Sequence, residues 1–359
     1  MTEDKQKINF EDQDIFVGID VHKKSWTVAV CTQHRCYRPF TISPPSVESL
    51  VSYLQGRFPL GFYVCAYEAG FSGFNLCEAL FDYAITCLVV NPADIPTSDR
   101  EAEFKTDARD AAKLARCLRS GELQSRHLPP KKLQGGRALS RLQEQFRSDL
   151  VRQKNRIKMH LFYFGATIPE EFDKPGRWSE ASIRWLYQLQ LPDPSATLVL
   201  QQLLGHLTCC RGMKRYTERQ VRQLGRNEDY RRQTELLETV PGIGQLTATK
   251  LLLQIGPIER FSSLDALCSY AGLVPASYNS GEATRQSRMT RRGHPQLRTM
   301  LIEAAWTAIT VDPALGHCYA ELKKRMPPQK AIVRVAKKLL ARIRFVLVNE
   351  APYEKGILA

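Results

Sequence analysis

The chain has 359 residues, which is long enough for two or three domains, and 43% of them are hydrophobic, which is ample for buried cores. Its formal net charge of +14 is unevenly spread: the first 120 residues carry 13 basic against 16 acidic side chains, and the remaining 239 carry 38 against 21. The start of the sequence is polar and has no apolar leader, and ten cysteines in so long a chain do not indicate a secreted disulfide framework. No apolar run is long enough to span a bilayer, which argues against a membrane protein. We therefore expect a reducing cytoplasm.

The first third of the chain predicts an open mixed sheet with helices on its faces. Apolar and alternating runs predict strands over 15–20, 25–31, 36–42, 61–68 and 86–90. Amphipathic stretches predict helices over 46–58 and 75–83 and from Asp107 onward, with Ser46 suited to an N-cap after a Pro-Pro breaker. This element order, β-β-β-α-β-α-β-α, is similar to that of the ribonuclease-H-like fold.

Long helices are predicted from residue 137 onward. A second long segment over about 196–237 can return antiparallel to the first, and a connector with Pro and Trp over 168–194 joins them. The pattern fits a plain helical hairpin for dimerisation. It also fits an arm that binds DNA, because basic residues cover the other faces of the helices. The apolar stripe of the first helix consists of Leu142, Phe146, Leu150, Ile157 and Leu161.

A glycine turn over 240–244 separates two further helical patterns. Gly242 and Gly244 have no side chain, so backbone N–H groups could approach a phosphate there. This is typical of a helix-hairpin-helix, a clamp on the DNA backbone, although Pro-Gly also forms simple turns. A basic segment follows, in which the predicted phosphate contacts, with a solvated loop as the alternative, are Arg285, Arg288, Arg291, Arg292 and Arg298.

Four carboxylates of the first third are candidates for a metal site in an enzyme that acts on nucleic acid. Asp20 and Glu68 end two predicted strands, and Asp107 and Asp110 share a helix face. Mg²⁺ prefers such oxygen ligands, with Mn²⁺ as an alternative, and two ions would stabilise the attacking and leaving oxygens at phosphorus. Each residue also has a structural interpretation: a turn residue for Asp20, an N-cap for Asp107 and a first-turn acid for Asp110.

Three further residues invite a zinc interpretation. Cys31, His34 and Cys36 lie close together, but they straddle two predicted strands and no second Cys/His pair is nearby. Structural cysteines are therefore favoured.

Short motifs recur along the chain: Gly-Ile-Asp-Val-His-Lys (18–23), Tyr-Glu-Ala-Gly (67–70), Lys-Thr-Asp-Ala-Arg-Asp-Ala (105–111), Pro-Gly-Ile-Gly (241–244), Tyr-Ala-Gly-Leu-Val-Pro (270–275), Ser-Gly (280–281) and Arg-Arg-Gly-His-Pro-Gln-Leu-Arg (291–298). In this order they resemble the motifs of the Piv invertase and insertion-sequence DEDD transposase family, whose members are bridge-RNA-guided recombinases. The resemblance covers nearly the whole chain, and the agreement of separate motifs makes it specific.

The resemblance implies three domains: a RuvC-like DEDD domain over 1–125, a helical coiled-coil region over 135–237 and a mainly helical C-terminal transposase domain over 238–359. It implies that Ser280 attacks the DNA phosphate and becomes a phosphoserine ester. Ser277 and Tyr278 are neighbouring rivals, and Ser280 is favoured on the motif alone. His294 replaces the family's usual Asn, which leaves its role open. The implied magnesium ligands are Asp20, Glu68, Asp107 and Asp110.

The resemblance also implies partners that composition cannot reveal. These are target and donor double-stranded DNA, a structured noncoding bridge RNA whose base pairing selects the DNA, and further copies of the chain in a dimer or tetramer. The place of action would be the bacterial or archaeal cytoplasm, at the nucleoid. Two alternatives stay open: a metal-dependent nuclease or Holliday-junction resolvase in which water attacks, and a non-catalytic scaffold that binds nucleic acid.

Overall fold

The computed structural model describes residues 10–97, 106–172, 178–280, 283–289 and 293–355. Of residues 275–280 and 283–289 the backbone alone is described. The chain divides into two compact units, Met1–Leu128 and Pro129–Ala359.

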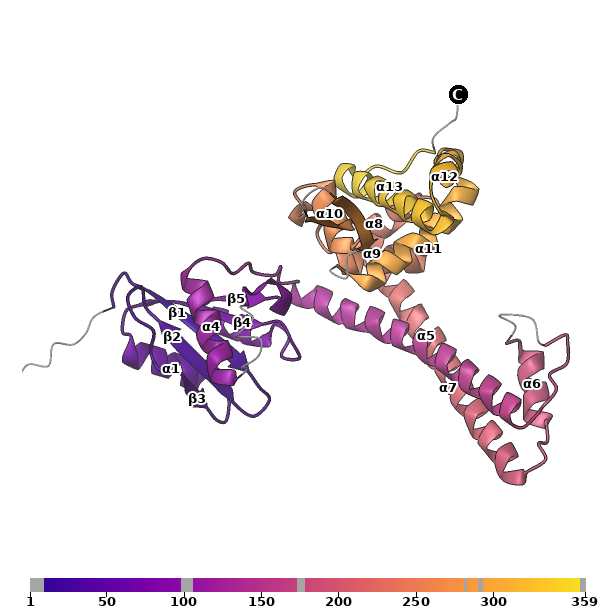
Figure 1. Ribbon diagram of the computed structural model, residues 1–359, viewed down its shortest axis with the longest axis horizontal. Helices are drawn as coiled ribbons and strands as arrows, with labels where there is room; N and C mark the ends of the chain where they lie inside the picture. Colours follow the sequence, from indigo (N-terminus) through magenta and orange to yellow (C-terminus); the bar gives the residue numbers. More distant parts are fainter. Residues whose placement is uncertain (1–9, 98–105, 173–177, 281–282, 290–292, 356–359) are drawn as a thin grey trace, which may run out of the picture. The chain divides into compact units, whose positions relative to one another are not determined.

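A five-stranded mixed sheet forms the centre of the first unit (Figure 1). Its strand order is β3-β2-β1-β4-β5; β1 pairs antiparallel with β2 and parallel with β4, and β4 pairs parallel with β5. The mixed α/β architecture predicted from the sequence is confirmed, although the third strand is shorter than predicted. The elements are β1 (Asp14–Val21), β2 (Trp26–Cys31), β3 (Phe40–Ile42), α1 (Val47–Arg57), β4 (Phe62–Glu68), α2 (Asn75–Phe81), β5 (Thr86–Val90), η1 (Pro92–Asp94) and α4 (Asp107–Arg119).

The two faces of this sheet bury separate cores because strand side chains alternate. Odd-numbered residues of β1, such as Ile15 and Ile19, pack with α1 and α2. Phe16 packs with α4 on the other face. Gly18 lies on that second face, where an added Cβ would lie 2.5 Å from the amide nitrogen of Ala115 and 2.8 Å from the Cβ of Leu114. The glycine therefore lets α4 lie directly on β1.

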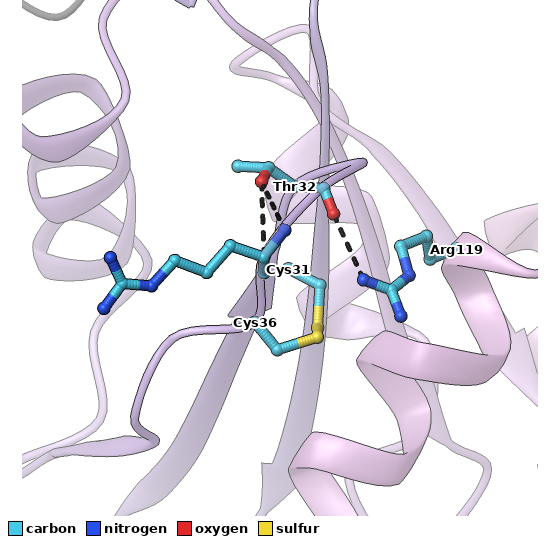
Figure 2. Close-up of a disulfide and its surroundings, with 5 residues drawn as sticks. Cys31, Thr32, Cys36 and Arg119 are labelled. Atoms are coloured by element: carbon cyan, nitrogen blue, oxygen red, sulfur yellow. Dashed lines mark hydrogen bonds between the residues drawn. A yellow bond between two sulfur atoms is a disulfide. The ribbon is translucent and has the colours of Figure 1, made fainter.

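A disulfide closes the loop between β2 and β3, and Figure 2 shows the bond between Cys31 and Cys36. The two residues are partners in an isolated antiparallel bridge, which places their Cα atoms 4.0 Å apart. The other eight cysteines are free. The structural interpretation of Cys31 and Cys36 is confirmed. The expectation of a reducing cytoplasm did not predict a disulfide between them. Because both sulfurs are bonded, they cannot bind zinc in this state.

Two long helices, α5 (Lys131–Tyr163) and α7 (Pro194–Gly225), lie antiparallel side by side in the second unit (Figure 1). The short helix α6 (Glu180–Gln188) packs against the C-terminal end of α5 and the N-terminal part of α7. The apolar core of this pair includes Ile157 and Leu161, as predicted. The prediction was wrong for Leu142, which is 39% exposed. In that part α5 contacts α7 and α9 (Gln245–Ile255) and buries small and polar residues such as Gly136 and Gln143 instead.

The rest of the second unit is a helical bundle with one β-hairpin. The elements are α8 (Glu228–Glu238), α9 (Gln245–Ile255), η2 (Ile258–Arg260), α10 (Leu264–Ala271), β6 (Pro275–Ser280), β7 (Ala283–Met289), α11 (Pro295–Val311), α12 (Pro313–Arg325) and α13 (Pro328–Asn349). All six α-helices contribute to its core, α12 through Leu315. No helix in the described part of the chain is long and apolar enough to cross a membrane.

Candidate metal centre and serine hairpin

The end of β1 and the start of α4 bring two of the predicted carboxylates together. Asp20 is the second-last residue of β1 and faces α4, two positions beyond Gly18. Asp107 is the first residue of α4. The N-cap is Thr106, whose Oγ1 accepts a hydrogen bond from the amide of Arg109, so the interpretation of Asp107 as the cap is wrong.

His22 completes a cluster that could hold a metal ion. Its Nε2 lies 3.2 Å from Oδ2 of Asp20 and 3.5 Å from Oδ2 of Asp107. Among the described residues, ligand atoms of these three side chains lie within 4.8 Å of one another. Such a set of carboxylates and an imidazole fits a divalent cation.

The electrostatics of Asp20 agree with a site that needs positive charge. Burial raises the pKa of the Asp20 carboxyl, and the negative charges of Asp107 and Asp110 raise it further. His22 opposes this by its charge and its hydrogen bond, which lower the pKa. A bound cation would stabilise the ionised form of Asp20.

The remaining two predicted ligands flank the cluster. Asp110 is one helical turn from Asp107 and is close enough to affect the Asp20 carboxyl. Glu68 is the last residue of β4, and the parallel register that pairs Ile19 with Tyr67 puts Glu68 beside Asp20 at the same end of the sheet. Ile19 and Tyr67 share one core, so alternation directs Asp20 and Glu68 to the α4 face.

His22 is the residue that the sequence analysis missed. Sequence reasoning included it only within the motif over 18–23. The available signal was its position directly after β1 and two residues beyond Asp20, since residues two apart in extended chain share a face.

The predicted nucleophile lies in a separate element of the second unit. Ser280 is the last residue of β6 and pairs with Ala283 of β7. Arg285 and Arg288 lie on β7, and Arg285 pairs with Tyr278. Arg291 and Arg292 lie outside the described residues.

The base of this hairpin is closely packed. An added Cβ at Gly293, whose φ is +113°, would lie 2.5 Å from the Cα of Gly272. The His294 amide donates to the Tyr270 carbonyl at 2.9 Å, and Nη1 of Arg298 donates to the Gly272 carbonyl at 3.3 Å. These contacts hold the two ends of the segment that carries β6 and β7 against each other.

His294 has a definite structural role. It is the N-cap of α11, and its Nδ1 accepts a hydrogen bond from the amide of Leu297 at 3.2 Å. An asparagine side chain makes the same kind of cap. Histidine can therefore replace the Asn that is usual at this position in the family that the motifs resemble.

The two glycines of the predicted clamp differ in their surroundings. Gly242 has φ +80°, and an added Cβ would contact the Ala304 carbonyl and lie 3.0 Å from the Ala308 amide, so close packing on α11 requires this glycine. Gly244 is the N-cap of α9 and has open space where a Cβ would be. Open approach to the amides of a helix N-terminus is therefore available at Gly244.

Comparison with known proteins decides the family. The model described as "Transposase", for the DEDD domain of the IS110 type, matches residues 17–164, and the model described as "Transposase IS116/IS110/IS902 family" matches residues 234–320. The chain belongs to the IS110/IS116/IS902 transposase family. Both the carboxylates and Ser280 fall within matched residues.

Three relatives illustrate the range of similarity. The transposase for insertion sequence element IS1533 of Leptospira borgpetersenii is 24% identical over 358 residues, which cover 96% of this chain and 99% of the relative. The insertion element IS110 uncharacterized 43.6 kDa protein of Streptomyces coelicolor is 24% identical over 302 residues, 72% of this chain and 74% of the relative. The pilin gene-inverting protein of Moraxella bovis is 33% identical over 128 residues, 34% and 39% respectively.

An IS110-family transposase is an enzyme of DNA transposition and recombination. Its DEDD domain implies the use of a divalent metal, and the cluster of Asp20, His22 and Asp107 is a candidate site for it. Family membership also implies DNA binding. A nuclease or junction resolvase is not favoured by these matches.

Proposed function

We propose that this transposase is an RNA-guided DNA recombinase that cuts and rejoins strands through a covalent phosphoserine intermediate on Ser280. The observation that carries the proposal is that one chain contains two features. One is the cluster of acidic residues at the end of β1, and the other is a serine at the end of β6, in a hairpin whose base is closely packed at Gly272 and Gly293. Hydrolysis by water would need the first feature and not the second.

The serine chemistry conserves the energy of the cut bond. The Ser280 hydroxyl loses its proton to solvent, and Oγ attacks phosphorus; a bond between Oγ and phosphorus forms, and the bond from phosphorus to one deoxyribose oxygen breaks. That oxygen leaves as a hydroxyl group after taking up a proton. The hydroxyl of another strand then attacks the phosphoserine and releases the serine, so no nucleotide cofactor is needed.

The carboxylates would hold the metal that such phosphoryl transfer uses. We assign Asp20, Glu68, Asp107 and Asp110 as the acidic set, and His22 as the side chain that holds Asp20 and Asp107 together. Mg²⁺, or Mn²⁺ in its place, would supply charge stabilisation of the phosphoryl oxygens. The all-oxygen carboxylate set favours Mg²⁺, and the imidazole makes Mn²⁺ acceptable.

The basic second unit would hold the nucleic acids. Phosphate contacts are assigned to the amides near Gly244, in a helix-hairpin-helix, and to the arginines of the hairpin region: Arg285, Arg288, Arg291, Arg292 and Arg298. We assign the α5 and α7 pair to a coiled coil that serves assembly of a dimer or tetramer. The bridge RNA would select target and donor DNA by base pairing, in the cytoplasm at the nucleoid.

A strand-exchange assay with matched serine variants tests the mechanism. Ser280→Ala should abolish exchange of donor and target DNA, whereas Ser277→Ala should retain it. Asp20→Asn combined with Asp110→Asn should also abolish exchange, because the metal ligands are lost. Survival of exchange in Ser280→Ala overturns the covalent step, and cleavage without exchange in that variant would support the resolvase alternative.

A further inference from the structure

A basic face on α4 leads away from the metal cluster. The residues of this α4 basic face are Arg109, Lys113, Arg116 and Arg119. They are four of the 13 basic residues in the first 120, a part of the chain with 16 acidic residues. At 100° per residue they fall within about a third of the helix circumference, opposite the buried residues Ala111 and Leu118. Scattered charge for solubility would not concentrate in this way.

A pocket of about 530 Å³ lies beside this face. Three cations of the α4 basic face line it together with one carboxylate, that of Glu122. Burial raises the pKa of the Cys117 thiol, and the Glu122 charge raises it further, so this lining residue is uncharged at neutral pH. The lining residues are Pro96, Thr97, Lys113, Arg116, Cys117, Arg119, Ser120 and Glu122.

Neighbouring elements hold two of the cations in position. Lys113 Nζ donates to Oγ1 of Thr97, which follows η1. Arg119 Nη1 donates to the Thr32 carbonyl at 3.4 Å, and Figure 2 shows that this carbonyl belongs to the loop closed by the Cys31–Cys36 disulfide. Charges held by fixed partners lose less conformational entropy when they bind an anion.

We propose that the α4 basic face and its pocket bind the backbone of the DNA strand that is cut at the metal cluster. This inference rests on the proposed function. The face begins at Arg109, in the same helical turn as Asp107 and Asp110, so a strand whose phosphate lies at the cluster can continue along α4. From Arg109 to Arg119 the helix rises about 15 Å, a length over which one strand of a duplex presents about four phosphates.

Photocrosslinking from the pocket tests the occupant directly. In the full-length chain, Ser120→benzoylphenylalanine places the crosslinker at the pocket, and Ser52→benzoylphenylalanine, on an exposed position of α1, is the control. The probes are a mixed-sequence duplex DNA and an RNA of the same sequence. Crosslinks to DNA from position 120 and not from position 52 are expected, and crosslinks from position 120 to RNA alone would overturn the assignment of DNA.

Charge removal measures the strength of the contact. Lys113→Gln with Arg116→Gln should abolish the crosslink and make the slope of log binding constant against log salt less steep by about 1.8, since each lost phosphate contact accounts for about 0.9. Arg38→Gln with Arg57→Gln removes the same charge from exposed positions before β3 and on α1, and should leave the slope unchanged. Equal slopes for the two double variants would refute the pocket.

The crosslink separates this inference from the proposed mechanism. It needs DNA binding and not chemistry, so it should persist in Ser280→Ala. If no serine adduct forms but the crosslink does, the covalent mechanism fails and the pocket stands. If the adduct forms while Lys113→Gln with Arg116→Gln changes neither crosslink nor slope, the pocket fails and the mechanism stands.

Discussion

Gly18→Ala should disrupt the metal centre without touching any ligand. The added methyl group would contact the Ala111 carbonyl and lie 2.5 Å from the Ala115 amide, where ordinary contact begins at 3.4 Å. Those atoms belong to the backbone of α4, so the helix would have to move by about 1 Å. The same helix carries Asp107 and Asp110, and the movement would separate them from Asp20.

The magnitude follows from the cost of overpacking a core. Inserting a methyl group into a well-packed interface costs about 1–3 kcal/mol, which corresponds to a loss of hydrogen-exchange protection of about 5- to 160-fold in β1 and α4. Displacing a ligand by this distance should weaken metal affinity by about 10- to 100-fold, as loss of supporting contacts does at other metal sites.

Two measurements on the full-length protein check this prediction. Hydrogen exchange followed by mass spectrometry reports on β1 and α4 peptides, and electron paramagnetic resonance of free Mn²⁺ reports the binding constant. Gly56→Ala is the matched control, because nothing lies within 4 Å of its added Cβ on α1, and it should gain about 0.5–1 kcal/mol. Wild-type protection and Mn²⁺ affinity in Gly18→Ala would refute the packing of α4 on β1 as the support of the site.

Three further predictions concern the Asp20 carboxyl, the cap of α11 and the carboxylate near Lys250. Asp20→Asn should stabilise the metal-free protein at pH 7 by less than about 1 kcal/mol and should abolish Mn²⁺ binding. Because folding raises the pKa of Asp20, the wild-type protein gains stability as the pH falls through that pKa. The melting temperature of the variant should lack this gain. His294→Ala should cost about 1 kcal/mol in thermal unfolding, whereas His294→Asn restores the cap; equal losses would contradict that role. Glu144→Ala should lower the free energy of urea unfolding by about 3 kcal/mol, because it removes the carboxylate near the buried Lys250 ammonium. Glu303 is the control: its side chain is 58% exposed, and Glu303→Ala should lower that free energy by less than about 1 kcal/mol. Similar costs for the two glutamates would contradict the importance of burial there.

The sheet domain was predictable because its patterns are local. Alternating burial marks β1 and β2, and the predicted strand 86–90 coincides with β5. Ser46 caps α1 as predicted, with its hydroxyl accepting from the Ser49 amide. Such signals depend on a few neighbouring residues, so contacts with distant segments do not alter them.

Features that depend on contacts between distant segments were not predictable. Leu142 fits an apolar stripe by spacing, but α5 is a long helix that meets different partners along its length, so its buried face changes to Gly136 and Gln143. The disulfide between Cys31 and Cys36 was missed for a different reason. The two residues are five apart in the chain, and a bridge pairs the last residue of β2 with Cys36, but the expectation of a reducing cytoplasm argued against a bond between them.

The candidate site shows the same division. Spacing and strand ends were sufficient to select Asp20, Asp107 and Asp110, which the structure brings into electrostatic contact. His22 was not selected, because a histidine beside a turn can serve many purposes. Only the packing of α4 on β1 shows that its ring meets Asp107.

Mapping a covalent adduct between protein and DNA is the most direct test of the serine mechanism. A reaction with guide RNA, donor and target DNA is stopped under denaturing conditions, digested with protease and nuclease, and analysed by mass spectrometry. The account predicts one nucleotide adduct on Ser280 that is absent in Ser280→Ala and in Asp20→Asn with Asp110→Asn. Completed strand exchange with no trapped adduct on Ser280, or with an adduct on Ser277 or Tyr278, would contradict it.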